Sequence, residues 1–248
     1  MQSILPDRYD VQARLGPLAL TLSPLVLGVL VWTGLPSVPA AIVVTAVLAV
    51  FGKWLAELGR ARGKKLEAAL FRDWGGGRVT ARLRCLDTSN TDKAALFARR
   101  QRVALLVPEV RFPTEQDERE DPAAADAIYD RAVGALFERQ RQHNLVHAEN
   151  CSYGFIRNAL GLKPAAILFG FMGLLSTFHK SGWCLFSINS NMLTLTSMLI
   201  FAVMMWFVVA VTPVAVRRRN ERLADALYKA LQGMDLPVRP SGIHSGVG

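Results

Sequence analysis

Four apolar runs stand out along the chain, in two closely spaced pairs. They cover residues 15–35, 40–58, 165–178 and 192–216, and none contains more than two charged side chains. An α-helix needs roughly 20 mainly apolar residues to cross a bilayer, because about 30 Å of hydrocarbon is covered at 1.5 Å per residue. The pattern therefore predicts four transmembrane helices that form two hairpins. A turn at 36–39 and a polar loop at 179–191 would close these hairpins.

The stretch between the two pairs is charged, and most of it has a helical pattern. The second apolar run continues as a polar helix that we expect to end at Gly75-Gly76-Gly77. Residues 78–86 could form a short strand, but an irregular segment fits better because no partner strand is evident. Residues 93–107 are helical in pattern.

Two further helices are expected after the acidic linker at 108–122. Asp121 followed by Pro122 is a typical helix start, with an N-cap acceptor and then proline at the first helical position. A second helical pattern passes through 149–158 directly into the third apolar run. The predicted fold class is mainly α. Its expected parts are an N-terminal segment 1–14, a hairpin 15–58, a sensor and coupling domain 59–163, a second hairpin 164–216, and a C-terminal helix (221–231) with a disordered tail within 217–248.

The charge distribution predicts the orientation. The net charge is +9, and lysine and arginine gather on the side of the spans away from 36–39 and 179–191. The flanking cations on that side are Arg8, Arg14, Arg60, Arg62, Lys64, Lys65, Arg157, Lys163, Arg217, Arg218 and Arg219. Cytoplasmic flanks carry such an excess, so both termini and the 59–163 domain are expected to be cytoplasmic.

No set of residues predicts catalysis, and we expect a protein that is not an enzyme and has no cofactor. His143 and His147 are four residues apart on an expected helix, but the HExxH glutamate and a third ligand are missing, so a structural role is favoured over a metal site. The three cysteines, Cys85, Cys151 and Cys184, lack CxxC spacing and are expected to be free thiols.

The segment 60–102 contains twelve cations and four acids. Arginine dominates its second half, and an arginine fork grips phosphate through two parallel hydrogen bonds. With Trp74 available for stacking, a single-stranded or cyclic nucleotide ligand is one interpretation. The other is a solvated face that pairs with the acidic linker at 108–122, and the sequence favours neither.

Polar residues inside the apolar runs are few and uncharged apart from Lys53 and Glu57. The absence of a central Asp, Glu or Arg argues against a transporter. Because four helices cannot enclose an aqueous path, conduction would need a homo-oligomer. Pore-lining candidates are Thr194, Thr196 and Ser197, whereas the small residues Gly170, Gly173 and Ser176 could line a pore or, as we favour, pack helices closely.

Five stretches in a fixed order resemble a known family. They are DRYDVQARL (7–15), RDWGG (72–76), TARLRCL (80–86), DPAAADAIY (121–129) and ENCSYGFIRN (149–158). Together they resemble the transmembrane effectors encoded beside nucleotidyltransferases in bacterial anti-phage defence, the Hailong-type and CBASS-like membrane effectors. The departure is Trp74-Gly75-Gly76-Gly77, where the family pattern has a shorter glycine run followed by proline.

The resemblance implies a homo-oligomeric, tetrameric ion channel in the cell inner membrane. A nucleotide or short single-stranded DNA oligomer, made by the partner nucleotidyltransferase, would hold it closed, and loss of this ligand would depolarise the infected cell. The matching candidates for ligand contact are Arg72, Arg78, Arg82, Arg84, Arg157 and Asn158. The alternative function is a non-conducting membrane scaffold that recruits a cytoplasmic partner.

Overall fold

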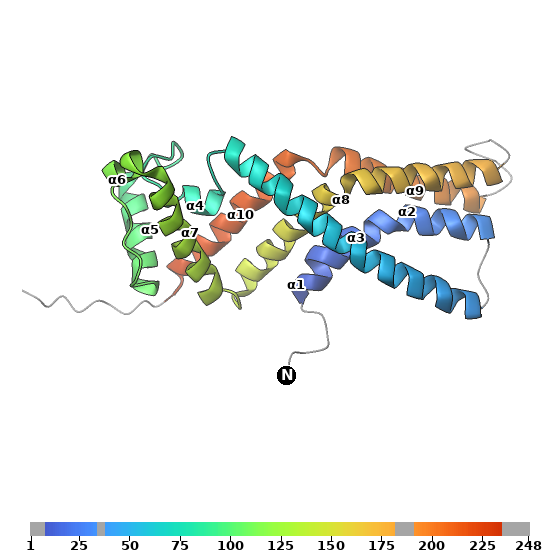
Figure 1. Ribbon diagram of the computed structural model, residues 1–248, viewed down its shortest axis with the longest axis horizontal. Coiled ribbons are helices and arrows are strands. Elements are labelled where there is room, and N and C mark those ends of the chain that lie inside the picture. The colour runs from blue at the N-terminus through green and yellow to red at the C-terminus, as the bar shows by residue number, and fades with distance from the viewer. Residues whose placement is uncertain (1–7, 34–37, 182–190, 235–248) are drawn as a thin grey trace, which may run out of the picture. The chain divides into compact units, whose positions relative to one another are not determined.

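A computed structural model describes residues 8–33, 38–181 and 191–234, and this part of the chain is helical with no strand (Figure 1). The elements are α1 (Arg8–Asp10), a π-helical turn η1 (Val11–Leu15), α2 (Gly16–Thr33), α3 (Val38–Asp73), α4 (Arg78–Ala81), α5 (Lys93–Leu106), α6 (Glu115–Glu120), α7 (Pro122–Arg139), α8 (Asn144–Lys180), α9 (Asn191–Val209) and α10 (Pro213–Gln232). The predicted mainly α class is confirmed. The segment 78–86 forms no strand, as predicted, but it begins with the short helix α4 and is irregular only after Ala81. Residues 36–37 of the expected turn, most of the loop at 179–191 with Cys184, and most of the expected tail lie outside the described residues. Residues 38 and 39, expected in that turn, already belong to α3.

The helices divide into two compact units. Unit 1 comprises Met1–Gly76 and His147–Arg222, and unit 2 comprises Gly77–Val146 and Leu223–Gly248. Along the sequence the chain passes between the units three times. Unit 2 therefore covers only the central part of the expected 59–163 domain and adds the second half of α10.

Three helices in the described residues are long and apolar enough to cross a membrane: Val11–Thr33, Asn144–Lys180 and Met192–Val209. They expose large apolar side chains such as Trp32, Phe171 and Phe201. Soluble domains rarely expose contiguous apolar patches of this extent. The second predicted span, 40–58, lies in α3, where side chains up to residue 44 are outside the described part, and it is not among these three.

The two long helices of unit 1 behave as the sequence predicts. α3 continues without interruption to Asp73 and ends where Gly75 and Gly76 adopt φ values of 74° and 116°. This left-handed backbone is accessible to glycine at little steric cost. α8 runs through 149–158 into the third apolar run and continues past Pro164.

The fourth apolar run is not one helix, which corrects the expected span 192–216. α9 ends at Val209, and α10 begins at Pro213, earlier than the C-terminal helix expected at 221–231. Proline has no N–H to continue the helical hydrogen bonds and is favoured at a helix start. The hydroxyl of Thr212 accepts a hydrogen bond from the Ala215 amide at 3.2 Å, which caps the new helix.

Lys163 of α8 binds backbone carbonyls at the C-terminal end of α9. Its Nζ donates hydrogen bonds to the carbonyl oxygens of Val208 at 3.1 Å and Val211 at 2.9 Å. The last carbonyls of a helix have no partner within it, and a cation there also interacts favourably with the helix dipole. Lys163 therefore ties the third apolar run to the end of the fourth.

Replacing Lys163 with methionine should destabilise the protein by about 1.5–3 kcal/mol, the usual range for hydrogen bonds to a charged group. The check is the thermal unfolding midpoint of the full-length protein in detergent. Lys65→Met, at an exposed position of α3, is the control and should change stability by less than about 0.5 kcal/mol. Equal midpoints for both variants would mean that the α9 carbonyls do not depend on Lys163.

The small residues of α8 pack helices closely, as we favoured. A Cβ added at Gly28 of α2 would lie 2.9 Å from Cα of Gly173. The Ser176 hydroxyl donates to the Gly28 carbonyl at 2.7 Å. α3 approaches α8 in the same way, because a Cβ at Gly161 would lie 2.6 Å from the Gly63 nitrogen and closer still to the Gly59 carbonyl oxygen. Small residues permit such backbone approach between membrane helices.

Unit 2 has its own apolar core. Tyr129 and Leu136 on the buried face of α7 pack with Val79, Leu83 and Val103. The second half of α10 completes this core with Ala224, Leu227, Tyr228, Ala230 and Leu231. The helix start is as predicted, because the Asp121 carboxylate accepts from the Ala124 amide at 2.9 Å.

Candidate functional site

The six predicted ligand contacts are divided between the units, three in each. Arg72, Arg157 and Asn158 belong to unit 1, and Arg78, Arg82 and Arg84 belong to unit 2. Arg72 is exposed near the C-terminal end of α3, whereas the other five are at least partly buried.

Asn158 and Arg157 make contacts within unit 1. Asn158 is 3% exposed, and its Nδ2 donates to the Ala13 carbonyl at 2.7 Å. Nη1 of Arg157 lies 3.2 Å from the Glu67 carboxylate, which also accepts a hydrogen bond from the Tyr153 hydroxyl. These side chains join α8 to η1 and α3, and this role accounts for Tyr153, Arg157 and Asn158 without a ligand.

The arginines of the first segment of unit 2 are also paired. Arg82 lies 2.5 Å from Asp225, and Arg84 lies 2.5 Å from Asp126. Arg78 is partly buried at the start of α4. Both ion pairs join residues far apart in the sequence, so each fixes the segment 78–86 against another helix, α10 or α7.

A buried polar network that sequence reasoning missed lies at the centre of unit 2. Arg100 is 6% exposed and Glu118 is 5% exposed, and Nη2 of Arg100 lies 2.8 Å from Oε1 of Glu118. Arg100 also donates to the carbonyls of Leu83 at 2.7 Å and Pro113 at 2.8 Å, and to the Tyr129 hydroxyl. The N–H donors of this guanidinium are therefore bonded to groups within unit 2.

Glu118 is equally well satisfied. It accepts from the backbone amides of Cys85 at 2.8 Å and Leu86 at 3.0 Å, and from the Tyr129 hydroxyl. Burial alone would raise the pKa of Glu118, but these hydrogen bonds and the Arg100 cation lower the pKa below its ordinary value. Burial and the hydrogen bond to Glu118 raise the pKa of Tyr129, which therefore stays a neutral donor.

The acidic linker pairs with part of the basic segment. Besides Arg100 with Glu118, Lys93 lies 3.9 Å from Glu115, and its Nζ donates to the Cys85 carbonyl at 2.7 Å. One of the two interpretations left open by the sequence, pairing with the linker, thus accounts for these two cations. Arg102 is exposed and makes no ion pair among the described residues.

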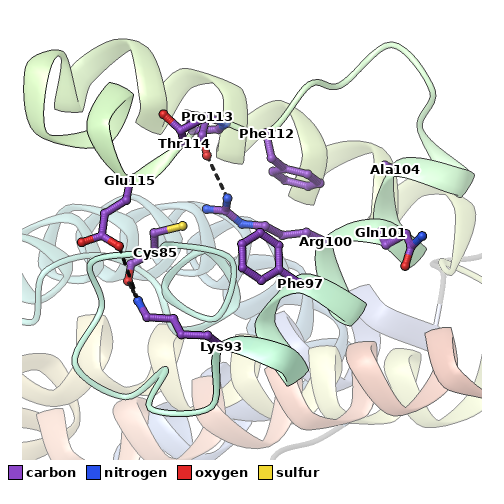
Figure 2. A pocket seen from close by; sticks show the side chains of 10 residues that line it. All are labelled: Cys85, Lys93, Phe97, Arg100, Gln101, Ala104, Phe112, Pro113, Thr114 and Glu115. Atoms are coloured by element: carbon purple, nitrogen blue, oxygen red, sulfur yellow. Dashed lines mark hydrogen bonds and ion pairs between the residues drawn. The ribbon is translucent and has the colours of Figure 1, made fainter.

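A cavity of about 710 Å³ opens beside this network, between α5 and the segment that precedes α6 (Figure 2). Its lining consists of Cys85, Lys93, Phe97, Arg100, Gln101, Ala104, Phe112, Pro113, Thr114 and Glu115. Phe97 is 63% exposed, so its ring is not part of the apolar core of unit 2. Small-molecule sites commonly measure about 300–1,000 Å³.

The lining of this cavity combines two kinds of chemistry. Phe97 and Phe112 offer aromatic surfaces on which a planar base could stack, and Gln101 and Thr114 offer hydrogen-bonding groups. Lys93 places a cation on the side where Figure 2 shows Glu115 and the Cys85 carbonyl. This arrangement suits a planar molecule of nucleotide size, and an anionic group on it would compete with Glu115 for Lys93. None of the six predicted contacts lines the cavity.

A smaller cavity of about 300 Å³ contains two of the remaining arginines. It is lined by Ala95, Ala98, Arg99, Arg102, Tyr228, Leu231 and Gln232. The Arg99 guanidinium lies 5.2 Å from the centre of the Tyr228 ring and donates to the Arg82 carbonyl at 2.6 Å. Burial lowers the pKa of Arg99 somewhat. This cavity could hold a phosphate group beside Arg102.

The pore-lining candidates lie on α9, and Thr196 and Ser197 bond to the backbone of their own helix. The Thr196 hydroxyl donates to the Met192 carbonyl at 2.8 Å, and the Ser197 hydroxyl donates to the Leu193 carbonyl at 2.9 Å. Ser197 is buried and Thr194 is partly buried. Such bonds satisfy hydroxyl groups inside a membrane, and they leave the pore assignment a prediction.

The described residues contain no group of three His, Cys, Asp or Glu side chains that could hold a metal ion. α8 begins at Asn144, so His143 precedes it and does not share a helix with His147 as expected. The His143 amide instead donates to the Gln140 carbonyl at 2.9 Å in the turn after α7. Cys85 and Cys151 are buried thiols, and neither is in a disulfide.

Comparison with known proteins gives no match. No family model, curated protein or solved structure matches the chain.

Proposed function

We propose that this chain is a ligand-gated ion channel of the cell inner membrane that acts as a membrane effector in bacterial antiviral defence. The observation that carries ligand gating is the Phe97–Phe112 cavity of unit 2, in a chain that also has three apolar helices of membrane-spanning length. The role in defence rests on the resemblance of the five sequence stretches to effectors encoded beside nucleotidyltransferases.

In this proposal α3 supplies a fourth span through residues 40–58, and both termini and the 59–163 domain are cytoplasmic. The channel is a homo-oligomer, because four helices of one chain cannot enclose an aqueous path, and the family resemblance implies that it is a tetramer. The lysines and arginines that flank the apolar runs support this orientation.

The ligand is a nucleotide or a short single-stranded DNA oligomer, and its binding holds the channel closed. A base would stack on Phe97 or Phe112, and a phosphate would bind near Lys93. Of the predicted contacts, Arg78 belongs to the same unit as this cavity and is a candidate for the rest of an oligomer. Because a ligand shifts an equilibrium only by its differential affinity, it must bind the closed form more tightly than the open form.

Planar-bilayer recordings of the full-length protein test the proposal. We expect conductance without ligand and a reduction when short oligodeoxynucleotides are added on the side of unit 2. Removing a stacked base costs about 1–3 kcal/mol, so Phe97→Ala should raise the half-blocking concentration about 5- to 150-fold.

Leu145→Ala is the matched control, because Leu145 is also an exposed apolar residue of unit 2 that does not line the cavity. It should be blocked like the unaltered protein. Absence of conductance under both conditions would contradict the channel, and equal block of Phe97→Ala and Leu145→Ala would contradict this ligand site.

The alternative, a non-conducting scaffold that recruits a cytoplasmic partner, is favoured by one observation. Arg82, Arg84 and Arg100 are each paired with a carboxylate of unit 2, which leaves fewer cations for an anionic ligand. Defence activity without membrane depolarisation in infected cells would support the scaffold.

A further inference from the structure

A groove of about 400 Å³ lies in unit 1 between residues 10–18, which run from α1 through η1 into α2, and residues 48–57 of α3. Its lining is Asp10, Arg14, Leu15, Leu18, Leu48, Ala49, Gly52, Lys53, Ala56 and Glu57. The apolar members form the walls. Of the four charged members, Asp10 and Arg14 precede Leu15 and Leu18 in the sequence, and Lys53 and Glu57 follow Leu48 and Ala49. The groove is therefore amphipathic along its length.

Gly52 leaves the wall of this groove open. A Cβ at Gly52 would meet Leu18 at 3.4 Å and Leu22 at 3.8 Å, which are ordinary van der Waals contacts. The backbones are thus not forced together here, in contrast to the approach of Gly161 to Gly63. A larger side chain at position 52 would occupy the groove.

The charges around the groove are unequally satisfied. Nε of Arg14 lies 3.1 Å from Asp10, and Glu57 lies 3.8 Å from Arg60. Lys53 is exposed and makes no ion pair among the described residues. The groove therefore offers one cation that lacks a carboxylate partner, and Arg14 is nearby.

The residues beside Lys53 suit the boundary between hydrocarbon and water. Val47 and Val50 are exposed apolar side chains on the preceding turn, and Val50 is 75% exposed. Trp54 is exposed directly after Lys53, and tryptophan is enriched at membrane interfaces. A lysine at this depth extends its amine toward the headgroups.

We propose that this groove is a binding site for a glycerophospholipid, with one acyl chain between Leu15, Leu18 and Leu48 and the phosphate at Nζ of Lys53. The acyl chain covers apolar walls that no described side chain fills, and the phosphate supplies the anion that Lys53 lacks. This inference rests on the membrane placement of α2 and α3 and is independent of gating by a nucleotide.

Other occupants fit less well. A free phosphate would leave the leucine walls uncovered, and a purely apolar segment of a second copy would leave Lys53 without an anion. A phospholipid satisfies both the leucine walls and Lys53. Its acyl chain and its phosphodiester belong to one molecule, with the chain in the hydrocarbon and the phosphodiester at the membrane interface.

Native mass spectrometry of the full-length, delipidated protein tests this site. The protein is incubated in detergent with phosphatidylglycerol, with diacylglycerol of the same chains, or with glycerol 3-phosphate. We expect phosphatidylglycerol to be retained, diacylglycerol to bind at least tenfold more weakly, and glycerol 3-phosphate not to bind. Equal retention of diacylglycerol and phosphatidylglycerol would overturn the role of Lys53.

Two variants separate the two parts of the site. Gly52→Leu should fill the groove and Lys53→Ala should remove the phosphate contact, and each should lower phosphatidylglycerol retention at least tenfold. The controls are Val50→Leu, on the exposed face of the same helix, and Lys65→Ala, an exposed lysine farther along α3. Lys53→Ala changes an exposed side chain and so keeps the test decisive even if Gly52→Leu misfolds.

Retention by Lys53→Ala equal to that of Lys65→Ala would overturn the proposal. A change of subunit number in Gly52→Leu with unchanged lipid retention would also overturn it, because a neighbouring copy would then occupy the groove.

Discussion

Replacing Glu118 with alanine should destabilise unit 2 by about 3–5 kcal/mol, because it leaves the buried Arg100 cation without its carboxylate. The amides of Cys85 and Leu86 also lose their acceptor. Hydrogen exchange of the full-length protein, followed by mass spectrometry of peptides from α4 to α7, measures this change. At about 1.4 kcal/mol per tenfold, the most protected amides of unit 2 should exchange about 100- to 4,000-fold faster.

Glu120→Ala is the control, since Glu120 belongs to the same helix, α6, and is exposed. Its effect should be below about 0.5 kcal/mol. Protection in Glu118→Ala that equals protection in Glu120→Ala would contradict a structural role for the Arg100–Glu118–Tyr129 network.

The same network predicts a sensitivity to acid. The pKa of Glu118 in the folded protein lies below its ordinary value of 4.5. The resulting stabilisation is therefore fully present above pH 4.5 and is lost as the pH falls through the lower folded pKa. In Glu118→Ala this contribution should be absent at every pH.

The helices themselves were predictable because their signals are local. The apolar runs, the Gly75-Gly76-Gly77 stop and the Asp121-Pro122 start each occupy a few consecutive residues, and the structure confirms the helix end and the helix start. The break at 210–212 carried a local signal too, because Thr212-Pro213 is a cap followed by a first-turn proline. High hydropathy up to Val216 concealed it, since hydropathy reports burial in lipid and not helix continuity.

The pairings of unit 2 were not predictable in the same way. Arg82 meets Asp225, and Arg100 meets both Glu118 and Tyr129, and nothing in the spacing of these residues indicates which carboxylate each arginine selects. The sequence showed a basic segment and an acidic linker, which indicates the net charge of each but not which residues pair. Only the tertiary structure shows that Arg100 is a core residue while Arg102 faces outward.

The Phe97–Phe112 cavity illustrates the same limit. Phe97 is on α5, Phe112 is in the linker, and Cys85 is in the irregular segment, so the cavity exists only after three segments pack. A signal was available at Phe97, an aromatic residue between Leu96 and Ala98 in a basic helix, but it is equally typical of a core position. Phe97 is exposed in the folded unit and lines the cavity, so it is not a core residue.

Replacing Gly161 with alanine should destabilise unit 1 by about 3 kcal/mol, at the upper end of the usual cost of overpacking. The added Cβ would lie 2.6 Å from the Gly63 nitrogen and closer to the Gly59 carbonyl oxygen. Both are backbone atoms, which cannot rotate away as a side chain can. α3 and α8 would have to separate, and the contact of Leu162 with Leu18 and Leu55 would loosen.

Thermal unfolding of the full-length protein in detergent measures this cost, and about 2–4 °C per kcal/mol for a chain of this size gives a drop of about 6–12 °C. Gly134→Ala is the matched control, because it makes the same change in α7 where no atom lies within 4 Å of the new Cβ. It should stabilise the protein by about 0.5–1 kcal/mol through helix propensity alone. The two variants should therefore move the midpoint in opposite directions. Equal, upward shifts of the two midpoints would contradict the close approach of the α3 and α8 backbones at Gly59, Gly63 and Gly161.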